Sequence, residues 1–474
     1  MLSGWRLGRF HAALVTGALC LAVPTLAAPA LAMPEAGLPA EMAELEVRPA
    51  GSSLALDGHG YRGDLRLSAR GGKVQVLNEV SVEEYMLGLR EVPPSWPLEA
   101  QKAQAIAARS YALNRALSAR SKGLDHDLCP TAACQVYGGL EAEAKGGAGW
   151  AEAVRATSQQ VLLHGGQPIL AMYSSSNGGR SVAGSQPYLR SVADPDDARS
   201  PLHRWRVEVP ETAIGAAVAL PEGAELTAVE RSGQSVVARW IQVPADPGAE
   251  IVQGSHPVAV ADFRSRLEAA HPAPPDLPRL LPSTSFGLTE GASADHVAIV
   301  GGGWGHGIGL SQYGALGKAL RGMPAPQILA SYYAGLRPTR TPAALPGVLR
   351  VQLSMAPAVR VGGGSLSMRA DGMVVAGAER GEWTVTAKGD RLRLSPPPGW
   401  TPPGPVNQPD VPLPVADPFG PANASVLGAV PHLPTPSSRP ASAVAALLLA
   451  SVGWALQRRA AHVPPQASPR RPAG

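Results

Sequence analysis

An alanine-rich run at residues 96–113, "WPLEAQKAQAIAARSYAL", constrains the fold of this chain more than any other feature. Pro97 suits the first turn of an α-helix, and Ser95 stands near the position of an N-terminal cap. The positions that recur at helical spacing are Leu98, Gln101, Ala105, Ala108, Tyr111 and Ala112. Because an alanine side chain ends at Cβ, other backbone can approach closely. The sequence therefore predicts a central helix packed inside the fold.

Alternating apolar and polar residues on both sides of this helix predict antiparallel strands. Residues 51–80 alternate between glycine-bearing turns, and 161–179 predict a hairpin with a Gly-Gly turn. Residues 205–290 are assigned to β-rich structure, and 296–336 predict a strand, a glycine-dense loop and two short helices. Alternation resumes near the C-terminal side and predicts a small β-rich region at 347–395. We therefore expect an α+β fold, mixed and β-rich around one alanine-rich helix.

The N-terminus has the pattern of a secretory signal peptide. Two arginines precede the apolar run "HAALVTGALCLAVPTLAAPALA", which ends in small residues at 30–32. We expect residues 1–32 to be removed on export and residues 33–49 to form a short leader. Cys20 would leave with the signal. Lipid attachment at Cys20 is the less favoured alternative, because Leu19 stands where a small residue is usual.

The chain becomes proline-rich after residue 395. Residues 396–440 are too rich in proline to pack as a core and predict an extended spacer. An apolar run follows within 441–459, and Arg458 and Arg459 close it on the side expected for a cytoplasmic flank. We expect a C-terminal membrane anchor. A buried or interfacial helix is the alternative, and the spacer disfavours it.

The charge pattern argues against a nucleic-acid partner. The net charge of +4 over 474 residues arises from scattered basic residues, mostly arginine, with no dense basic patch. Hydrophobic residues make up 45% of the chain, which is ample for a core.

A single carboxylate, Glu91, stands immediately before the central helix in "REVPPSWP". Beside Pro93, Pro94 and Trp96 its carboxyl group would be partly desolvated, which raises the pKa and lets the group hold a proton near neutral pH. Such a group can protonate a leaving oxygen. The alternative is a surface glutamate near a helix start, where acidic residues are common.

The segment "GGWGHGIGLSQYGA" combines four alternating glycines with His306, Gln312 and Tyr313. The glycines allow positive φ angles or close approach of a ligand, and the three side chains offer polar edges. A tight structural turn, with His306 bonded to backbone, is the alternative. No lysine follows as in a phosphate-binding loop, and the order of elements does not fit a dinucleotide fingerprint.

A Ser/Asn loop, "MYSSSNGGRS", follows a predicted strand. Tyr173, Ser175, Ser176 and its asparagine supply the donors and acceptors that sugar hydroxyls need. A serine nucleophile is disfavoured because no Gly-x-Ser-x-Gly turn is present. Arg109 lies among alanines on the central helix, so it needs either a carboxylate or a ligand as its partner.

Two cysteines remain after removal of the signal, Cys129 and Cys134, in "DHDLCPTAACQVYGG". An even pair in an exported chain favours a disulfide. His126 together with both cysteines could instead bind zinc, but three candidate ligands fall short of a closed four-ligand site. We expect no other cofactor.

These stretches, in this order, resemble the stage II sporulation protein D / amidase enhancer (SpoIID/LytB) family of bacterial cell-wall proteins. The resemblance covers about residues 50–336 and implies a peptidoglycan-acting domain at 50–346. One departure is the Val-Pro that follows Glu91, where the family has Met or a small residue. Some relatives carry zinc near "CQVYGG". The matching runs are "LNEVSVEEYMLGLREVPPSWPLEAQKAQAIAARSYAL", "CQVYGG", "AMYSSSNGGRS" with "YLRSVADPDD", "GGGWGHGIGLSQYGALGKAL" and "ILASYYAG".

The resemblance implies a lytic transglycosylase that cleaves the MurNAc-GlcNAc bond of glycan strands, with Glu91 as both acid and base. One acid suffices, because the sugar's own 6-hydroxyl closes a 1,6-anhydro ring and no water needs activating. The central helix would then border a glycan groove. The residues expected to line this groove are Arg109, Tyr173, Ser175, Ser176, His306, Gln312 and Tyr313.

Two alternatives remain open. The first is a non-catalytic module that binds glycan and stimulates a partner N-acetylmuramoyl-L-alanine amidase, as the family's second name implies. The other is a wall-anchored structural protein, which leaves the glycine/His/Gln loop unexplained. All three place the chain outside the cytoplasm, in the cell wall or periplasm, tethered to the membrane by its C-terminal segment.

Overall fold

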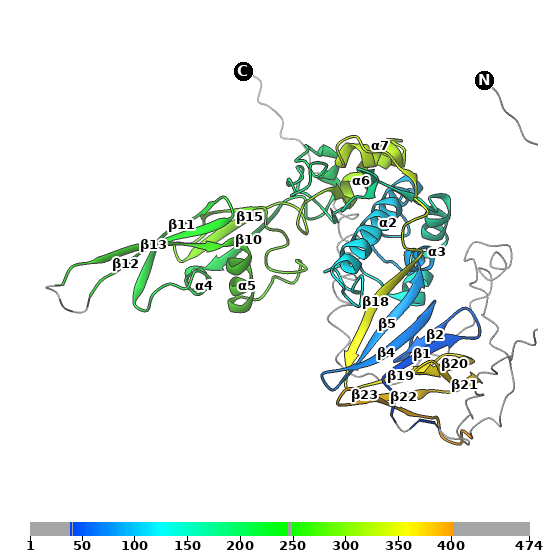
Figure 1. The fold of residues 1–474 in the computed structure, drawn as a ribbon. Helices are drawn as coiled ribbons and strands as arrows, with labels where there is room; N and C mark the ends of the chain where they lie inside the picture. Colours follow the sequence, from blue (N-terminus) through cyan, green and yellow to red (C-terminus); the bar gives the residue numbers. More distant parts are fainter. Residues whose placement is uncertain (1–37, 40, 245, 247–248, 402–474) are drawn as a thin grey trace, which may run out of the picture.

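The computed structural model describes residues 38–39, 41–244, 246 and 249–401. Within them the chain has an α+β fold, as expected, and its buried apolar residues form three separate cores. Figure 1 shows a helical centre, a β-rich body at one end of it and an arm projecting to one side. We define these parts as the β-body (41–81 and 348–395), the helical centre (82–201 and 302–347) and the arm (202–301).

Two antiparallel sheets share the core of the β-body. Their strands are β1 (Glu44–Pro49), β2 (Leu54–Leu56), β3 (His59–Tyr61), β4 (Asp64–Arg70), β5 (Lys73–Ser81), β18 (Val348–Ala356), β19 (Ala358–Gly362), β20 (Leu366–Ala370), β21 (Met373–Glu379), β22 (Trp383–Lys388) and β23 (Arg391–Ser395). The strand order is β18-β5-β4-β1-β20-β21 in one sheet and β23-β22-β19-β2-β3 in the other. Apolar residues alternate along the strands, so Leu45, Val47, Leu65 and Leu67 all face one interior.

Two boundaries expected from the sequence differ from the structure. The β-rich region expected at 347–395 does not pair only with itself, because β18 pairs with β5 and β20 pairs with β1. The leader expected at 33–49 ends in β1, a strand that lies between β4 and β20. Alternation within a segment predicts a strand and its buried face, but it does not identify the neighbouring strand.

The helical centre is built around the predicted alanine-rich helix. Its helices are α1 (Val82–Leu87), α2 (Leu98–Ser121), α3 (Gly139–Ala156), α6 (Gln312–Leu320) and α7 (Ala325–Tyr332). Helix α2 packs against the other four, and its Ala103, Ala107 and Ala108 are fully buried. The prediction that Ser95 lies near the N-terminal cap of α2 is wrong. Pro97 occupies the N-cap position, and no side chain caps the helix there.

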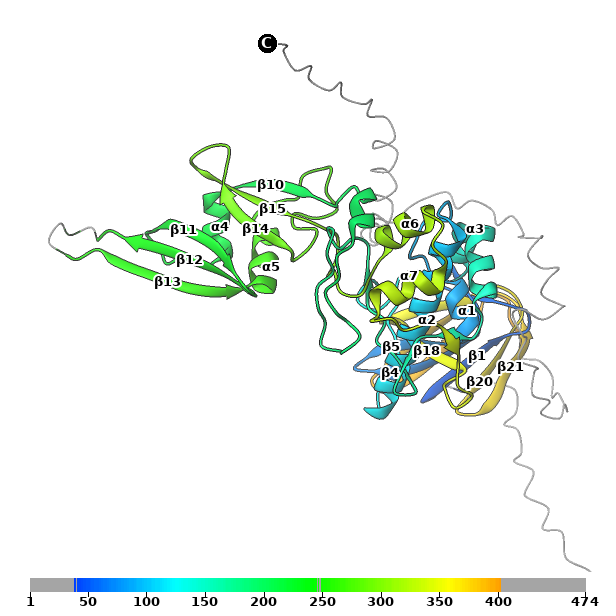
Figure 2. The same ribbon diagram turned by 90° about the horizontal axis from the view of Figure 1, so that it is seen from above.

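The arm has its own core and is less purely β than expected. Its elements are β10 (Trp205–Pro210), α4 (Glu211–Ala217), β11 (Ala224–Ser232), β12 (Ser235–Gln242), β13 (Val252–Ala259), α5 (Val260–Ala270), β14 (Phe286–Glu290) and β15 (His296–Gly301). The strand orders are β10-β15-β14 and β11-β12-β13, and α4 and α5 share their core. Figure 2 shows the arm extending away from the helical centre in a second view.

Short elements connect these parts and bring two predicted loops together. They are β6 (Gln160–Val161), β7 (Leu163–His164), β8 (Gln167–Pro168), β9 (Tyr173–Ser174), the 3-10 helix η1 (Pro195–Arg199), β16 (Leu310–Ser311) and β17 (Thr339–Arg340). The predicted Gly-Gly hairpin is confirmed in β7 and β8, with Gly165 and Gly166 at positive φ. Strands β9 and β16 pair in parallel, which places the Ser/Asn loop beside the glycine-dense loop.

Several expected segments lie outside the described residues. They are the signal peptide at 1–32, residues 402–440 of the proline-rich spacer and the membrane anchor at 441–459. Among the helices of the described residues, none combines the length and the apolar character needed to cross a membrane.

Candidate functional site

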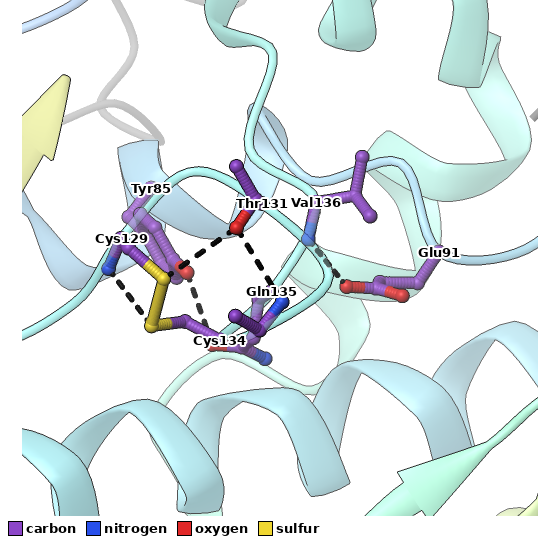
Figure 3. Close-up of a disulfide and its surroundings, with 8 residues drawn as sticks. Tyr85, Glu91, Cys129, Thr131, Cys134, Gln135 and Val136 are labelled. Atoms are coloured by element: carbon purple, nitrogen blue, oxygen red, sulfur yellow. Dashed lines mark hydrogen bonds between the residues drawn. A yellow bond between two sulfur atoms is a disulfide. The ribbon is translucent and has the colours of Figure 1, made fainter. Parts of the chain in front are cut away.

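Glu91 lies half-buried in the loop between α1 and α2, held by the segment that follows the cysteines. The backbone N–H of Arg90 donates to the carbonyl of Val136 over 3.0 Å. In return, the N–H of Val136 donates to Glu91 Oε1 over 2.8 Å, as Figure 3 shows. This reciprocal pair fixes the direction of the carboxyl group through backbone atoms rather than through the neighbouring prolines.

Two further donors reach the carboxylate. The phenol of Tyr173 donates to Glu91 Oε1 over 3.0 Å, and the side-chain amide of Gln312 also donates to the carboxylate. Burial raises the pKa of Glu91 above its ordinary value of 4.5, and these hydrogen bonds offset part of the rise. Glu91 therefore keeps its proton to a higher pH than an exposed glutamate does.

Two pairs of aromatic rings lie in the helical centre, and Tyr111 and Tyr173 of one pair interact electrostatically with Glu91. The ring of Tyr313 meets Trp96 edge-on, with 5.1 Å between ring centroids, and Tyr111 meets Tyr173 edge-on at 6.3 Å. Trp96 and Tyr313 are each 8% exposed. Of the residues predicted from the sequence, the structure thus brings Tyr173 and Gln312 into contact with Glu91, whereas Tyr313 contacts Trp96.

The glycine-dense loop has the backbone conformation that the sequence predicted. Gly303, Gly305, Gly307 and Gly309 all have positive φ angles. Close approach matters at two of them: a Cβ on Gly305 would lie 2.8 Å from Ser174 Cβ, and one on Gly309 would lie 2.0 Å from the carbonyl oxygen of Met172. The glycines therefore let this loop lie directly against the Ser/Asn loop.

His306 is bonded to backbone, which was the structural alternative for this residue. Its Nδ1 accepts from the N–H of Ile308 over 3.0 Å, and its ring also bonds the backbone of Tyr173. Burial lowers the pKa of His306, and the bond to Tyr173 partly opposes that shift. A neutral ring with its proton on Nε2 satisfies both contacts. His306 thus ties the glycine-dense loop to the strand that carries Tyr173.

The two serines predicted to bind sugar are placed differently. The carbonyl of Ser175, which is half-buried, accepts from the N–H of Tyr313 over 3.0 Å at the start of α6. Ser176 is 1% exposed, and its hydroxyl donates to Asp197 over 2.7 Å. Ser176 is therefore a buried anchor, which corrects its expected place among the sugar-binding residues.

A buried carboxylate network that the sequence did not assign holds the two loops. Asp197 is fully buried and also accepts from Ser311 over 2.6 Å and contacts His203 Nδ1 at 2.9 Å. Asp194, equally buried, pairs with Lys318 and accepts from the phenol of Tyr332 over 2.5 Å. Both acids belong to the run "YLRSVADPDD", one of the stretches on which the family resemblance rests, and that run was the feature of the sequence that could have identified them.

Arg109 has an internal partner, which corrects its expected place in the groove. Its side chain is 1% exposed and pairs with Glu83, and it also donates to the carbonyls of Val154 and Gln160. The sequence argument required either a carboxylate or a ligand, and the structure supplies the carboxylate. Arg109 therefore stabilises the packing of α1, α2 and α3 and does not reach Glu91.

Cys129 and Cys134 form a disulfide that closes the short loop before Gln135 and Val136 (Figure 3). The ring of His126 contacts Asp125 instead, with 2.6 Å between Nδ1 and Oδ1. No group of three or more His, Cys, Asp or Glu residues suited to a metal occurs in the described part of the chain. The loop leads directly into the residues that hold Glu91.

Gln135 and Val136 are the site residues that sequence reasoning missed. Their signal was the quoted "CQVYGG", but neither an amide nor a valine indicates by type that it supports a carboxylate. The contact that matters at Val136 is made by its backbone N–H, which every non-proline residue possesses.

Comparison with known proteins finds a family match over the segment that contains Glu91. Residues 70–164, which include Glu91, the central helix and the disulfide, match the family model described as stage II sporulation protein. An uncharacterized protein of Brachyspira hyodysenteriae is 29% identical over 295 residues, covering 59% of this chain and 73% of its own length. Stage II sporulation protein D of Bacillus subtilis is 29% identical over 283 residues, covering 55% and 75%.

The amidase enhancer of Bacillus subtilis is 28% identical over 284 residues, which are 52% of this chain and 38% of that protein. The segment that matches the family model contains the motif around Glu91. The family match over residues 70–164 and the similarity to these relatives together support the stage II sporulation protein D / amidase enhancer family for this chain.

Proposed function

We propose that this protein is an exported lytic transglycosylase that cleaves the MurNAc-GlcNAc bond of peptidoglycan glycan strands, with Glu91 as acid and base. The observation that carries the proposal is the environment of Glu91, a half-buried carboxyl group with a raised pKa. In the part of the chain that the structure describes, the groups that shift its pKa, besides burial, are a backbone N–H, a phenol and an amide, and no second carboxylate is among them. Non-hydrolytic cleavage needs only one.

The two oxygens of Glu91 have different roles in this mechanism. Oε1 accepts from the N–H of Val136 and from the phenol of Tyr173, so a proton is disfavoured there. We therefore assign the proton of neutral Glu91 to Oε2, whose remaining lone pair can still accept from the amide of Gln312. From Oε2 it passes to the glycosidic oxygen of the leaving GlcNAc as the bond to C1 of MurNAc breaks through an oxocarbenium-like state.

The carboxylate then takes the proton of the MurNAc 6-hydroxyl. The hydroxyl oxygen bonds to C1, which closes the 1,6-anhydro ring and returns Glu91 to its protonated form. Burial supports the first step, because it raises the pKa of Glu91 and so favours the protonated form that gives the proton. Tyr173 and Gln312 bond the carboxyl group and would line the sugar site together with Tyr313.

The test is digestion of purified peptidoglycan, with and without stem peptides, by the protein and its Glu91→Gln variant, with products weighed by mass spectrometry. We expect 1,6-anhydro ends from the wild type and a loss of about 10²–10⁴-fold in the variant. Glu141→Gln is the matched control, because that carboxylate is 48% exposed and pairs with Lys145 on the surface. Equal activity in wild type and Glu91→Gln would exclude Glu91 as the acid.

A second function is favoured by the similarity to a protein named amidase enhancer. In this alternative the chain binds glycan without cleaving it and stimulates a cell-wall amidase. The same digest distinguishes the two. An absence of new ends, with faster cleavage by an added amidase that Glu91→Gln leaves intact, would establish the binding module.

Both functions place the protein outside the cytoplasm, where peptidoglycan lies. The expected signal peptide at 1–32 and membrane anchor at 441–459 fit that location. Fractionation of cells followed by N-terminal sequencing of the mature chain tests both segments.

A further inference from the structure

Gln135 is a buried amide whose hydrogen bonds all lie within the protein. It is 1% exposed, and its Oε1 accepts from the phenol of Tyr85 over 3.0 Å. Its Nε2 donates to the carbonyl of Ala108 over 3.3 Å and to the phenol oxygen of Tyr173 over 2.9 Å. A side chain with these contacts is not placed to touch a substrate, so any effect on the reaction must pass through a neighbour.

The partners of Gln135 determine which way its amide faces. A backbone carbonyl can only accept, so the carbonyl of Ala108 requires the nitrogen of the amide and not the oxygen. The second N–H of that nitrogen then points at the phenol oxygen of Tyr173. Because Gln135 donates to this oxygen, the phenol's one hydrogen is free to point at Glu91 Oε1, 3.0 Å away.

We propose that Gln135 is a positioning residue that acts on Glu91 through Tyr173. It holds the phenol as a hydrogen-bond donor to Oε1, which leaves Oε2 as the oxygen that carries the transferable proton. The consequence for catalysis rests on the proposed function, whereas the hydrogen-bond relay from Ala108 to Glu91 does not.

The relay can be measured without any enzyme assay. The ¹³C carboxyl signal of Glu91, assigned by its loss in Glu91→Gln, is titrated in the full-length protein. Gln135→Met frees the phenol to donate elsewhere, so the carboxylate loses a donor and the pKa of Glu91 rises by about one unit. Tyr173→Phe removes the same donor directly and should raise it by as much.

A double variant and a matched control separate a relay from simple packing. If Gln135 acts through Tyr173, Gln135→Met adds no further shift in the Tyr173→Phe background. Tyr85→Phe is the control: it also removes one buried hydrogen bond of Gln135, but the carbonyl of Ala108 still orients the amide. We expect Tyr85→Phe to leave the pKa of Glu91 unchanged.

Tyr85, Tyr111 and Tyr173 are titratable groups that interact with Glu91. All three remain neutral where Glu91 titrates, because burial raises their own pKa values. A shift in Gln135→Met therefore does not come from a change of charge nearby.

If that variant does not fold, Gln135→Asn keeps the amide but shortens its reach to Tyr173, and the same upward shift is expected.

An unchanged Glu91 pKa in a folded Gln135 variant, or a shift that adds fully to that of Tyr173→Phe, would overturn the proposal. The activity readout is the alkaline limb of the kcat/KM profile, which moves upward by about one pH unit in Gln135→Met and stays in place in Tyr85→Phe. Should the wild type release no anhydro ends, the proposed function fails while the titration still tests the relay.

Discussion

The guanidinium of Arg109 and the carboxylate of Glu83 form a two-point ion pair, with Nε–Oε1 at 3.0 Å and Nη2–Oε2 at 2.8 Å. Arg109 comes from the central helix and Glu83 from α1, the helix that leads into the loop of Glu91. The pair therefore joins the two helices that lie on either side of the loop of Glu91.

We expect Arg109→Met to lower the free energy of unfolding by about 3–5 kcal/mol, because it leaves a carboxylate in a largely buried position without its partner. Urea unfolding measures this loss. Arg393→Met is the matched control, since the pair of Arg393 with Glu41 is solvent-exposed and contributes at most about 1 kcal/mol. A stable Arg109→Met protein that no longer binds peptidoglycan would restore Arg109 to the sugar site.

The pH dependence of the proposed reaction follows from Glu91. The acid acts in its protonated form, so kcat/KM falls as the pH rises through the pKa of Glu91, which burial places above 4.5. Tyr173→Phe removes a hydrogen bond to the charged form, which raises that pKa further. We expect the alkaline limb of the profile to move upward by about one unit. A limb that stays in place or moves to lower pH would contradict the assignment of Glu91.

His306 makes the stability of the glycine-dense loop dependent on pH. Burial lowers its pKa below the ordinary 6.5, so the unfolded chain takes up a proton before the folded chain does. The contribution of neutral His306 is fully present above pH 6.5 and is lost as the pH falls below it. His306→Asn keeps an acceptor for the N–H of Ile308 but does not titrate.

The measurement is the difference in free energy of unfolding between wild type and His306→Asn from pH 7.5 to about 5. We expect the wild type to lose stability relative to the variant as the pH falls. Taking the difference removes the opposite contribution of Glu91, whose pKa is raised. A constant difference across the range would show that His306 does not titrate in this loop.

The close approach of the two loops predicts unequal effects of alanine at neighbouring glycines. Both Gly305→Ala and Gly307→Ala place a side chain at positive φ, which costs about 1–2 kcal/mol. At Gly305 the new Cβ would also lie 2.8 Å from Ser174 Cβ, whereas at Gly307 the nearest atom, in Val182, is 3.4 Å away. We expect Gly305→Ala to lose more activity and more thermal stability, and equal losses would show that φ strain alone acts.

Local patterns in the sequence were sufficient for several features. The alanine spacing predicted α2, the Gly-Gly turn predicted the β7-β8 hairpin, and the alternating glycines predicted the positive φ angles at 303–309. The Pro- and Trp-flanked position of Glu91 predicted a raised pKa, and its pKa is raised. Each of these follows from neighbours along the chain, because backbone conformation and periodic burial are local properties.

Contacts between distant segments were decided by packing in three dimensions. The pairing of β5 with β18, the ion pair of Arg109 with Glu83 and the bond from Tyr173 to Glu91 join residues that no spacing rule connects. A buried polar group must find a partner, and the sequence shows that need at Arg109 without naming Glu83. The sequence thus predicts the helix, the turns and the acid from local patterns. The residues that position the acid are determined only when strands and loops far apart in the sequence pack together.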